Sequence, residues 1–124
     1  MKKVYLIAIL CILADQISKA LARKFFSFEE NYGAAFGILQ NKLSLLIFIG
    51  FLIIGFLIYY SNLVEGLGIY GIGLLLGGAT SNLIDRMLYG YIVDFIKIWI
   101  WPAFNLADMF NVTGVILMII YFKK

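Results

Sequence analysis

Four long apolar segments constrain most strongly what this chain can fold into. They cover residues 4–22, 43–60, 66–85 and 103–122 of the 124-residue sequence. Each is close to the roughly 20 residues that an α-helix needs to cross a bilayer. Hydrophobic residues make up 64% of the chain and charged residues 14%, whereas a water-soluble domain is about half apolar and a quarter charged. We therefore predict an all-α membrane protein in which four helices form a single domain over residues 1–124.

The lengths of the connections predict how these helices are arranged. The turn between the second and third segments, residues 61–65, is so short that the two helices must form an antiparallel hairpin. The other two connections, residues 23–42 and 86–102, are longer. With four antiparallel crossings, the end of the first helix, the start of the second, the end of the third and the start of the fourth share one side of the membrane.

The first segment also has features of a secretory signal peptide. It follows a basic MKK start, and Ala20-Leu21-Ala22 has the small-x-small pattern of a cleavage site. However, Asp15 and Lys19 lie inside the segment, which is unusual for a signal peptide, and the segment is long enough to span a bilayer. We therefore interpret it as an uncleaved first helix.

The basic residues near the helix ends are divided almost equally between the two sides of the membrane. Lysine and arginine are usually enriched in short loops that face the cytoplasm. The side with both termini carries four: Lys2, Lys3, Lys123 and Lys124. The opposite side carries five: Arg23, Lys24, Lys42, Arg86 and Lys97. Because the first helix usually decides the orientation, and Lys2 and Lys3 precede it, we expect both termini in the cytoplasm.

The composition excludes several kinds of site. The chain has no histidine and one cysteine, Cys11, so it can form neither an intrachain disulfide nor a Cys/His metal site. The net charge of +3 comes with lysines at both ends of the chain, which suits a membrane surface better than a nucleic acid. We expect no metal, no cofactor and no nucleic-acid partner.

The polar residues of the apolar segments gather on one predicted side. Asp15 lies near the end of the first segment, Asp85 at the end of the third, and Asp108 five residues into the fourth. Asn31 and Asp94 lie in the two longer connections on the same side. Ionisable groups inside a membrane are costly and usually functional. The sequence therefore predicts one polar site at a single membrane face.

A purely structural role is the competing interpretation of these residues. Asp15 and Lys19 are four residues apart on one helix face, in the favourable order for an ion pair. Asp85 and Arg86 could neutralise each other. Two further pairs are three residues apart: Asn82 with Asp85, and Asn105 with Asp108. Such pairs could do no more than hold the helices together.

Asp94 and Asp108 are the two carboxylates that have no obvious cation. Two facing carboxylates can share a proton, so that one activates a water as a general base while the other donates a hydrogen bond to a scissile carbonyl. No histidine base is present, and Cys11 has no partner base. Spacing alone does not establish that Asp94 and Asp108 meet, and intramembrane acids also serve in transport.

Four short blocks, in this order along the chain, resemble the lipoprotein signal peptidases (signal peptidase II), which are bacterial aspartyl peptidases. DQISK at residues 15–19 is similar to the family's DQ-x-[TS]-K, and NYGAAFG at 31–37 to its N-x-GAAF. GGATSNLIDRMLYGYIVDFI at 77–96 is similar to GGA-x-GN-x-x-DR followed by G-x-VVDF, with Ser81 in place of a glycine. FNLAD at 104–108 is similar to FN-x-AD.

This resemblance implies an activity and a role for each matching residue. The family cleaves prolipoproteins just before a diacylglyceryl-modified cysteine, and its members add a small extracytoplasmic β-cradle to four transmembrane helices. By resemblance, Asp94 and Asp108 are the catalytic dyad, and Asp15 and Lys19 hold the site from the first helix. The supporting residues implied are Asn31, Asn82, Asp85, Arg86 and Asn105.

The same resemblance implies the protein's surroundings. We expect a multi-pass protein of the bacterial cytoplasmic membrane, with its active site at the extracytoplasmic face. Its partners would be lipid-modified prolipoproteins and membrane lipids, and we expect it to be a monomer.

Two other classes of protein share some of these features. A small four-helix multidrug transporter is equally short and apolar and usually depends on one acid in its first helix, a part that Asp15 could take. A scaffold subunit of a membrane complex would not need two unpaired carboxylates. Substitution separates the classes, because a transporter should depend most on Asp15 and a peptidase on Asp94 and Asp108 together.

Overall fold

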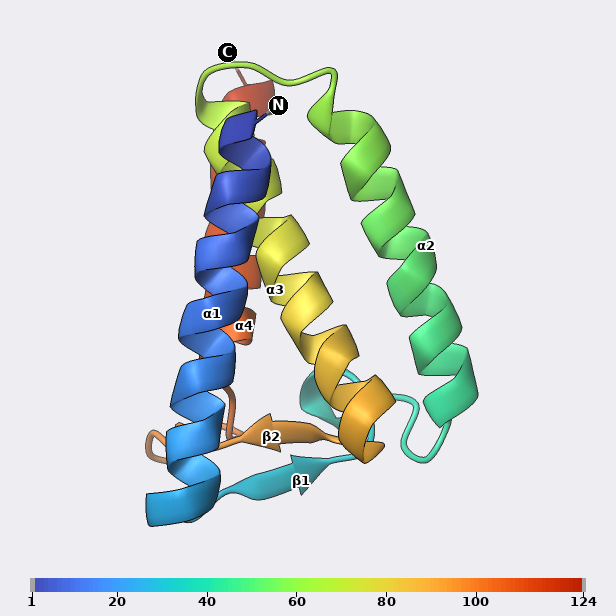
Figure 1. The fold of residues 1–124 in the computed structure, drawn as a ribbon, viewed down its shortest axis with the longest axis vertical. Coiled ribbons are helices and arrows are strands. Elements are labelled where there is room, and N and C mark those ends of the chain that lie inside the picture. Colours follow the sequence, from blue (N-terminus) through green and yellow to red (C-terminus); the bar gives the residue numbers. More distant parts are fainter. Residues whose placement is uncertain (1, 124) are drawn as a thin grey trace.

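The computed structural model describes residues 2–123 and contains four long helices and one small sheet. The helices are α1 (Lys2–Phe25), α2 (Leu43–Ser61), α3 (Leu67–Tyr89) and α4 (Leu106–Phe122). Strands β1 (Glu29–Asn31) and β2 (Ile92–Asp94) and a short 3-10 turn (Ala35–Gly37) lie in the two longer connections. Figure 1 shows both described chain ends at one end of the helices and the sheet at the other.

Three helices, α1, α2 and α3, are long and apolar enough to cross a membrane. The fourth, α4, is apolar but has only 17 residues. The expected start of this helix at residue 103 is wrong, because Phe104 is still extended and pairs with Ile96 in an isolated β-bridge. The helix begins only after Asn105, which is its N-cap.

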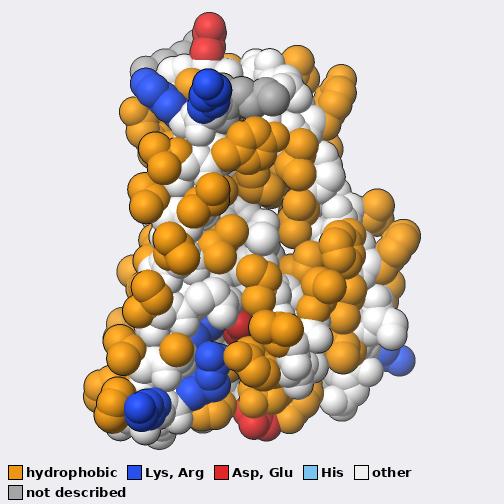
Figure 2. All heavy atoms as spheres, viewed as in Figure 1, with side chains coloured by type: hydrophobic (Ala, Val, Ile, Leu, Met, Phe, Trp, Pro, Cys, Tyr) orange, Lys and Arg blue, Asp and Glu red, His pale blue; other side chains and the backbone are white. Residues whose placement is uncertain are grey.

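The surface of the helices is apolar along most of its length. Large hydrophobic side chains such as Leu10, Phe48 and Ile116 are about half exposed or more. Figure 2 shows hydrophobic side chains over the helices, with charged side chains gathered toward the two ends. A surface of this kind would be unfavourable in water, since it far exceeds the apolar patches of soluble monomers. It is the surface expected of helices that face lipid.

Glycines on α3 allow α1 and α4 to approach it closely. A Cβ on Gly77 would lie 2.6 Å from Cys11 Cβ of α1. On the other side, a Cβ on Gly114 of α4 would lie 2.9 Å from the carbonyl oxygen of Gly71. Small residues bring helix backbones together in this way in membrane proteins. In Figure 1, α2 stands apart from this closely packed group, with α3 between it and α1.

The two strands form an antiparallel sheet that joins the two longer connections. Glu29 pairs with Asp94, and Asn31 with Ile92. This pairing brings the segment after α1 beside the segment after α3. The small sheet implied by the family resemblance is therefore present, and it holds Asn31 and Asp94 at the same end of the molecule as the first turn of α4.

Candidate active site

Asp94 and Asp108 lie in the wall of one pocket of about 630 Å³ at the sheet end of the helices. Asp94 ends β2, and Asp108 is in the first turn of α4. The pocket is also lined by three other residues that the sequence predicts for the site, Asn31, Asn82 and Arg86. Loops and helices that are distant in sequence thus bring the two predicted catalytic carboxylates to one cavity.

Two asparagine amides connect these carboxylates. Asn105 Nδ2 donates to Asp94 Oδ1 at 2.9 Å and to Asn82 Oδ1 at 3.0 Å. Asn82 Nδ2 in turn donates to Asp108 Oδ1 at 3.1 Å. A continuous hydrogen-bonded path therefore runs from Asp94 through Asn105 and Asn82 to Asp108.

The orientation of each amide follows from its partners. Asn82 Oδ1 accepts from Lys19 Nζ at 3.0 Å and from Asn105, so its NH₂ group must face Asp108. Asn105 Oδ1 accepts from the backbone N–H of Asp108 at 2.9 Å, so its own NH₂ group faces Asp94. An acceptor oxygen that is held by donors leaves only donors for the carboxylates. The site therefore presents fixed N–H groups to both aspartates.

The start of α4 adds a further constraint on Asp108. Asn105 and Asp108 form a capping box, in which the Asn105 backbone N–H donates to Asp108 Oδ2 at 3.1 Å. The box satisfies two backbone donors at the helix start and fixes the Asp108 carboxylate near the positive end of the helix. Asp108 is thus the third residue of α4, closer to the helix start than the sequence predicts.

Asp94 is 4% exposed and its surroundings disfavour its charged form. Burial, followed by the charge of Asp108, raises the pKa of Asp94 to about 7. Hydrogen bonds from Asn31, at 3.1 Å to Oδ2, and from Asn105 act in the opposite direction. Near neutral pH this carboxyl can therefore hold a proton or release it, as a general acid or base must.

A second, fully buried cluster lies behind the asparagines. Lys19 Nζ contacts Asp15 Oδ2 at 2.6 Å and Asp85 Oδ2 at 2.9 Å, and all three side chains are 0% exposed. Asp15 Oδ1 accepts from the backbone N–H of Ala107 at 2.8 Å, and Asp85 Oδ2 from that of Val93 at 3.0 Å. The cluster therefore fixes the segment before Asp94 and the first turn of α4 to α1 and α3.

The pairing of Asp85 with Arg86, one option from the sequence, is wrong. Consecutive helical residues point in different directions, so Asp85 faces Lys19 of α1 while Arg86 turns to the pocket. Arg86 Nη2 donates to the carbonyl oxygen of Gly33 at 3.4 Å, which links α3 to the loop after β1. The guanidinium thus supplies the cation at the pocket wall.

Sequence reasoning missed two residues of the buried cluster. Gln16 Nε2 donates to Ser81 Oγ at 2.9 Å and to Asp85 Oδ1 at 3.0 Å. Ser81 Oγ donates to Asp15 Oδ2 at 2.6 Å. Ser81 stands where the family usually has glycine. Its hydroxyl is tolerated at this buried position because it is hydrogen-bonded to both Gln16 and Asp15. Gln16 could have been found from the sequence, because it is part of the DQISK block at residues 15–19, which resembles the family's DQ-x-[TS]-K.

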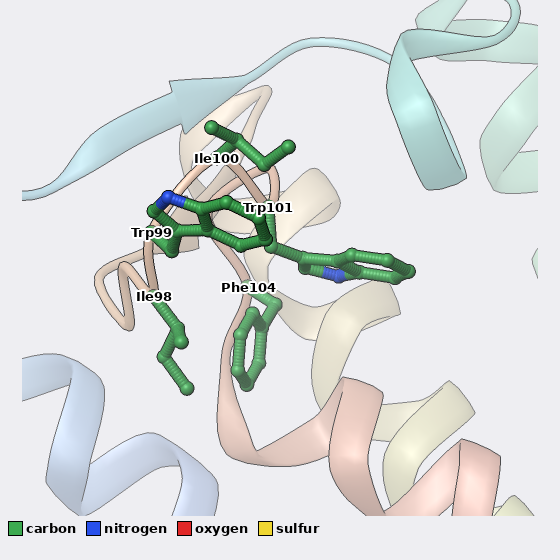
Figure 3. Close-up of a pocket in the computed structure, with 5 residues that line it drawn as sticks. All are labelled: Ile98, Trp99, Ile100, Trp101 and Phe104. Atoms are coloured by element: carbon green, nitrogen blue, oxygen red, sulfur yellow. The ribbon is translucent and has the colours of Figure 1, made fainter.

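An apolar loop borders the pocket on its outer side. Ile98, Trp99, Ile100 and Trp101 are between 56% and 86% exposed and, with Phe104, surround a hollow of about 470 Å³. Figure 3 shows Trp101 projecting away from Ile98, and Trp101 and Phe104 also line the carboxylate pocket. Trp101 meets Phe36 edge to face, with ring centroids 5.8 Å apart.

The geometry does not favour Asp15 as a transport site. Its carboxylate is 0% exposed, ion-paired with Lys19 and absent from the pocket wall. Asp94 and Asp108 line the pocket instead, together with two of their asparagine partners, Asn31 and Asn82. The cavity thus has two carboxylates that are held by fixed hydrogen-bond donors, and the pKa of one of them is near 7. Such a pair can catalyse hydrolysis by general acid–base chemistry.

Comparison with known proteins assigns the family independently of this geometry. A sequence model of the family described as Signal peptidase (SPase) II matches residues 7–124. The lipoprotein signal peptidase of Halothermothrix orenii is 38% identical over 95% of this chain and 93% of its own length. That of Moorella thermoacetica is 39% identical over 91% of this chain and 87% of its own length.

Two solved structures have the same fold as this chain. A bacterial membrane enzyme structure at 2.3 Å resolution superposes with a TM-score of 0.92 at 31% identity, covering 98% of this chain and 88% of that one. A second bacterial membrane enzyme structure, at 1.9 Å resolution, gives a TM-score of 0.86 at 32% identity over 100% and 94% of the two chains.

Proposed function

The chain belongs to the signal peptidase II family, and from this premise we propose that it is an aspartyl endopeptidase of bacterial prolipoproteins. It cleaves the signal peptide from a membrane-anchored precursor just before a cysteine that carries a diacylglyceryl group. Asp94 and Asp108 are the catalytic residues. The observation that carries the proposal is that these two carboxylates line one pocket and are joined by hydrogen bonds through Asn82 and the fully buried Asn105.

The two carboxylates share one proton during hydrolysis. The ionised carboxylate takes a proton from water as the water oxygen bonds to the scissile carbonyl carbon. The protonated carboxyl gives its proton to the carbonyl oxygen, which yields a tetrahedral diol. Collapse of the diol breaks the C–N bond, and the amine leaves with a proton from the carboxyl that accepted one in the first step. A hydroxyl of the diol returns its proton to the other carboxylate as the new carboxyl group forms, which restores the singly protonated pair. The raised pKa of Asp94 supports a shared proton near neutral pH.

The other predicted residues position this pair. Asn31 and Asn105 donate to Asp94, and Asn82 donates to Asp108, so they fix both carboxylates and stabilise their charged forms. The buried cluster of Lys19, Asp15 and Asp85 holds the backbone from which the dyad projects. The Arg86 guanidinium at the pocket wall is placed to bind a carbonyl oxygen of the substrate main chain.

We further propose how the protein lies in the membrane. All four helices cross the bilayer in alternating directions as one domain, residues 1–124, with α4 as a short fourth span. At about 1.5 Å per residue a 17-residue helix is about 25 Å long, within the range of membrane spans. Both termini face the cytoplasm, and the sheet, the pocket and the apolar loop lie at the outer face of the cytoplasmic membrane. The protein acts as a monomer.

The test is cleavage of a diacylglyceryl-modified prolipoprotein in liposomes by the wild-type chain, Asp94→Asn and Asp108→Asn. Asn keeps the shape of Asp and removes the acid–base group. We expect wild type to cleave before the modified cysteine and each variant to lose about 100-fold or more of its rate. Lys97→Met, which changes an exposed lysine, is the control and should remain active.

A folded Asp94→Asn or Asp108→Asn variant that cleaves at the wild-type rate would refute the dyad. If wild type itself fails to cleave this substrate, the proposed substrate class is wrong. Drug efflux that depends on Asp15 would then be the activity to measure.

A further inference from the structure

The pocket wall contains a polar side chain that the proposed mechanism does not use. Among the described residues, two buried side-chain atoms lack a hydrogen-bond partner: Arg23 Nη1 and Asn111 Oδ1. The Arg23 guanidinium instead lies over the ring of Tyr89, with 4.7 Å to the centroid. Asn111 lines the same pocket as Asp94 and Asp108. An unsatisfied buried acceptor is rare enough in proteins to need an explanation.

Asn111 lies one helical turn beyond Asp108 on the same helix. Three residues of α4 correspond to about 4.5 Å along the helix axis, in the direction away from the sheet. Gly78 of α3 makes room for the amide, because a Cβ at this position would collide with Asn111 Oδ1. The side chain therefore extends the polar wall of the pocket from the carboxylates toward the middle of the helices.

The rest of the pocket at this depth is largely apolar. Gly50 and Ile53 of α2, Ala79 of α3 and Val112 of α4 line it with Asn111. A polar group that served only to solvate the carboxylates would have no reason to lie here. In the structure Asn111 Oδ1 is buried against Gly78. The amide offers an acceptor and two donors, and its χ2 torsion is soft and roughly two-fold, so a rotation about χ2 turns Oδ1 to the pocket.

A membrane-anchored substrate needs such a group on this side of the carboxylates. A signal peptide in lipid satisfies its main-chain N–H and C=O groups within a helix. The carbonyl to be attacked must leave that helix, and the neighbouring peptide groups lose their partners in a site with little water. Extended chain advances about 3.3 Å per residue, so the amide of Asn111 is one or two residues away from the scissile bond.

We propose that Asn111 Oδ1 accepts a hydrogen bond from a main-chain N–H of the signal peptide, one or two residues before the scissile bond, and holds that stretch unwound. This inference rests on the proposed peptidase function. It makes Asn111 a substrate-binding residue in addition to those that the sequence blocks predict, and it assigns the deeper part of the pocket to the signal-peptide side of the substrate.

The experiment combines a variant of the enzyme with a variant of the substrate. Asn111→Leu keeps the branched shape and the number of heavy atoms of the side chain, with a larger volume, and removes the hydrogen bond; Asn111→Ala is the second variant if leucine does not fit beside Gly78. The substrates are a diacylglyceryl-modified peptide and a series in which one main-chain N–H at a time, over the residues before the scissile bond, is replaced by an ester oxygen. Asn62→Leu, the same substitution in the exposed turn after α2, is the control.

We expect Asn111→Leu to lower kcat/KM about tenfold on the all-amide substrate, while Asn62→Leu changes little. Wild type should lose about tenfold on one ester substrate, at the first or second residue before the cleavage site, and Asn111→Leu should lose nothing more on that substrate. Because the orphan acceptor is removed, the melting temperature of Asn111→Leu should equal or exceed that of wild type.

Two results would overturn the inference while leaving the peptidase assignment intact. One is an Asn111→Leu variant with wild-type kcat/KM. The other is an ester penalty of the same size in wild type and variant, because a merely structural role lowers activity on all substrates alike. Absence of any cleavage by wild type would instead refute the proposed function on which the inference depends.

Discussion

Lys19 illustrates how much one residue can organise in a membrane-bounded core. Its ammonium contacts the carboxylates of Asp15 and Asp85 and donates to Asn82, with no exposure of the side chain. Buried charges are tolerated only when they are paired and hydrogen-bonded, and every one of these groups is. Through Asn82 the same ammonium determines which end of the amide faces Asp108, so the buried cluster controls the chemistry of the pocket that it does not line.

The pKa of Asp94 predicts how cleavage depends on pH. Burial and the charge of Asp108 raise this pKa to about 7, so the carboxyl holds a proton below that pH and loses it above. The proposed dyad needs one shared proton, and the Asp94 carboxyl loses its proton above about pH 7. We expect kcat/KM to fall by up to about tenfold per pH unit above about 7. Initial cleavage rates in liposomes at several pH values measure this, and a flat profile up to pH 9 would contradict it.

Among the elements, α3 is the one on which the others are assembled. It lies between α1, α2 and α4, and its glycines set the distance to the neighbouring helices. The connection that follows α3 carries part of the site, because it contains β2. It begins at Gly90, which adopts a left-handed conformation with φ of 80° and whose backbone N–H donates to the Arg86 carbonyl oxygen. This turn directs the chain across the helix ends and brings Asp94 over the start of α4.

Close packing of α1 on α3 gives a prediction at this scale. In Gly77→Ala the added Cβ would meet Cys11 Cβ at 2.6 Å and the Ala8 carbonyl oxygen at 2.8 Å, so the helices must separate. We expect the free energy of unfolding to fall by about 1–3 kcal/mol, measured by unfolding in mixed micelles. Gly55→Ala is the matched control, because a Cβ there meets nothing within 4 Å. Equal stability of the two variants would show that Gly77 is not needed for close approach.

At the scale of the whole molecule, the apolar surface and the charged ends indicate how deeply the protein lies in the membrane. Tryptophan side chains concentrate at membrane–water interfaces. The loop with Trp99 and Trp101 extends the apolar surface beyond the helix ends, on the side of the carboxylate pocket. Placed at the outer interface, this loop would lie in the lipid headgroup region, where the proposed substrate would carry its lipid-modified cysteine.

The two tryptophans of the sequence are both in this loop, so fluorescence reports its depth directly. In Trp101→Phe the remaining Trp99, which is 86% exposed, is the only tryptophan, and excitation at the long-wavelength edge of the absorption band selects it over the tyrosines. In liposomes we expect lipids brominated near the headgroup end of the acyl chain to quench Trp99 strongly, and aqueous iodide to quench it weakly. Strong quenching by iodide with none by brominated lipid would place the loop in water and refute the proposed depth.

The sequence by itself determined that there are four long helices and at which end of the molecule the polar residues gather. Apolar segment length depends on local composition alone, and a five-residue turn leaves two helices no choice but an antiparallel hairpin. Alternation of direction then brings Asp15, Asp85 and Asp108 to one end. The ordered blocks were specific enough to indicate the family, since each block is short but their order on the apolar segments is restrictive.

Only the tertiary structure decided which polar groups meet. Asp85 takes Lys19 as its partner and not the adjacent Arg86, and Gln16 reaches Ser81, which is 65 residues further along the chain. The helix α4 begins at Leu106 and not at residue 103 as expected, because a β-bridge with Ile96 keeps Phe104 extended. Such pairings depend on how helices rotate and how closely they pack. Residue type and spacing within one segment leave both undetermined, because they describe one helix at a time.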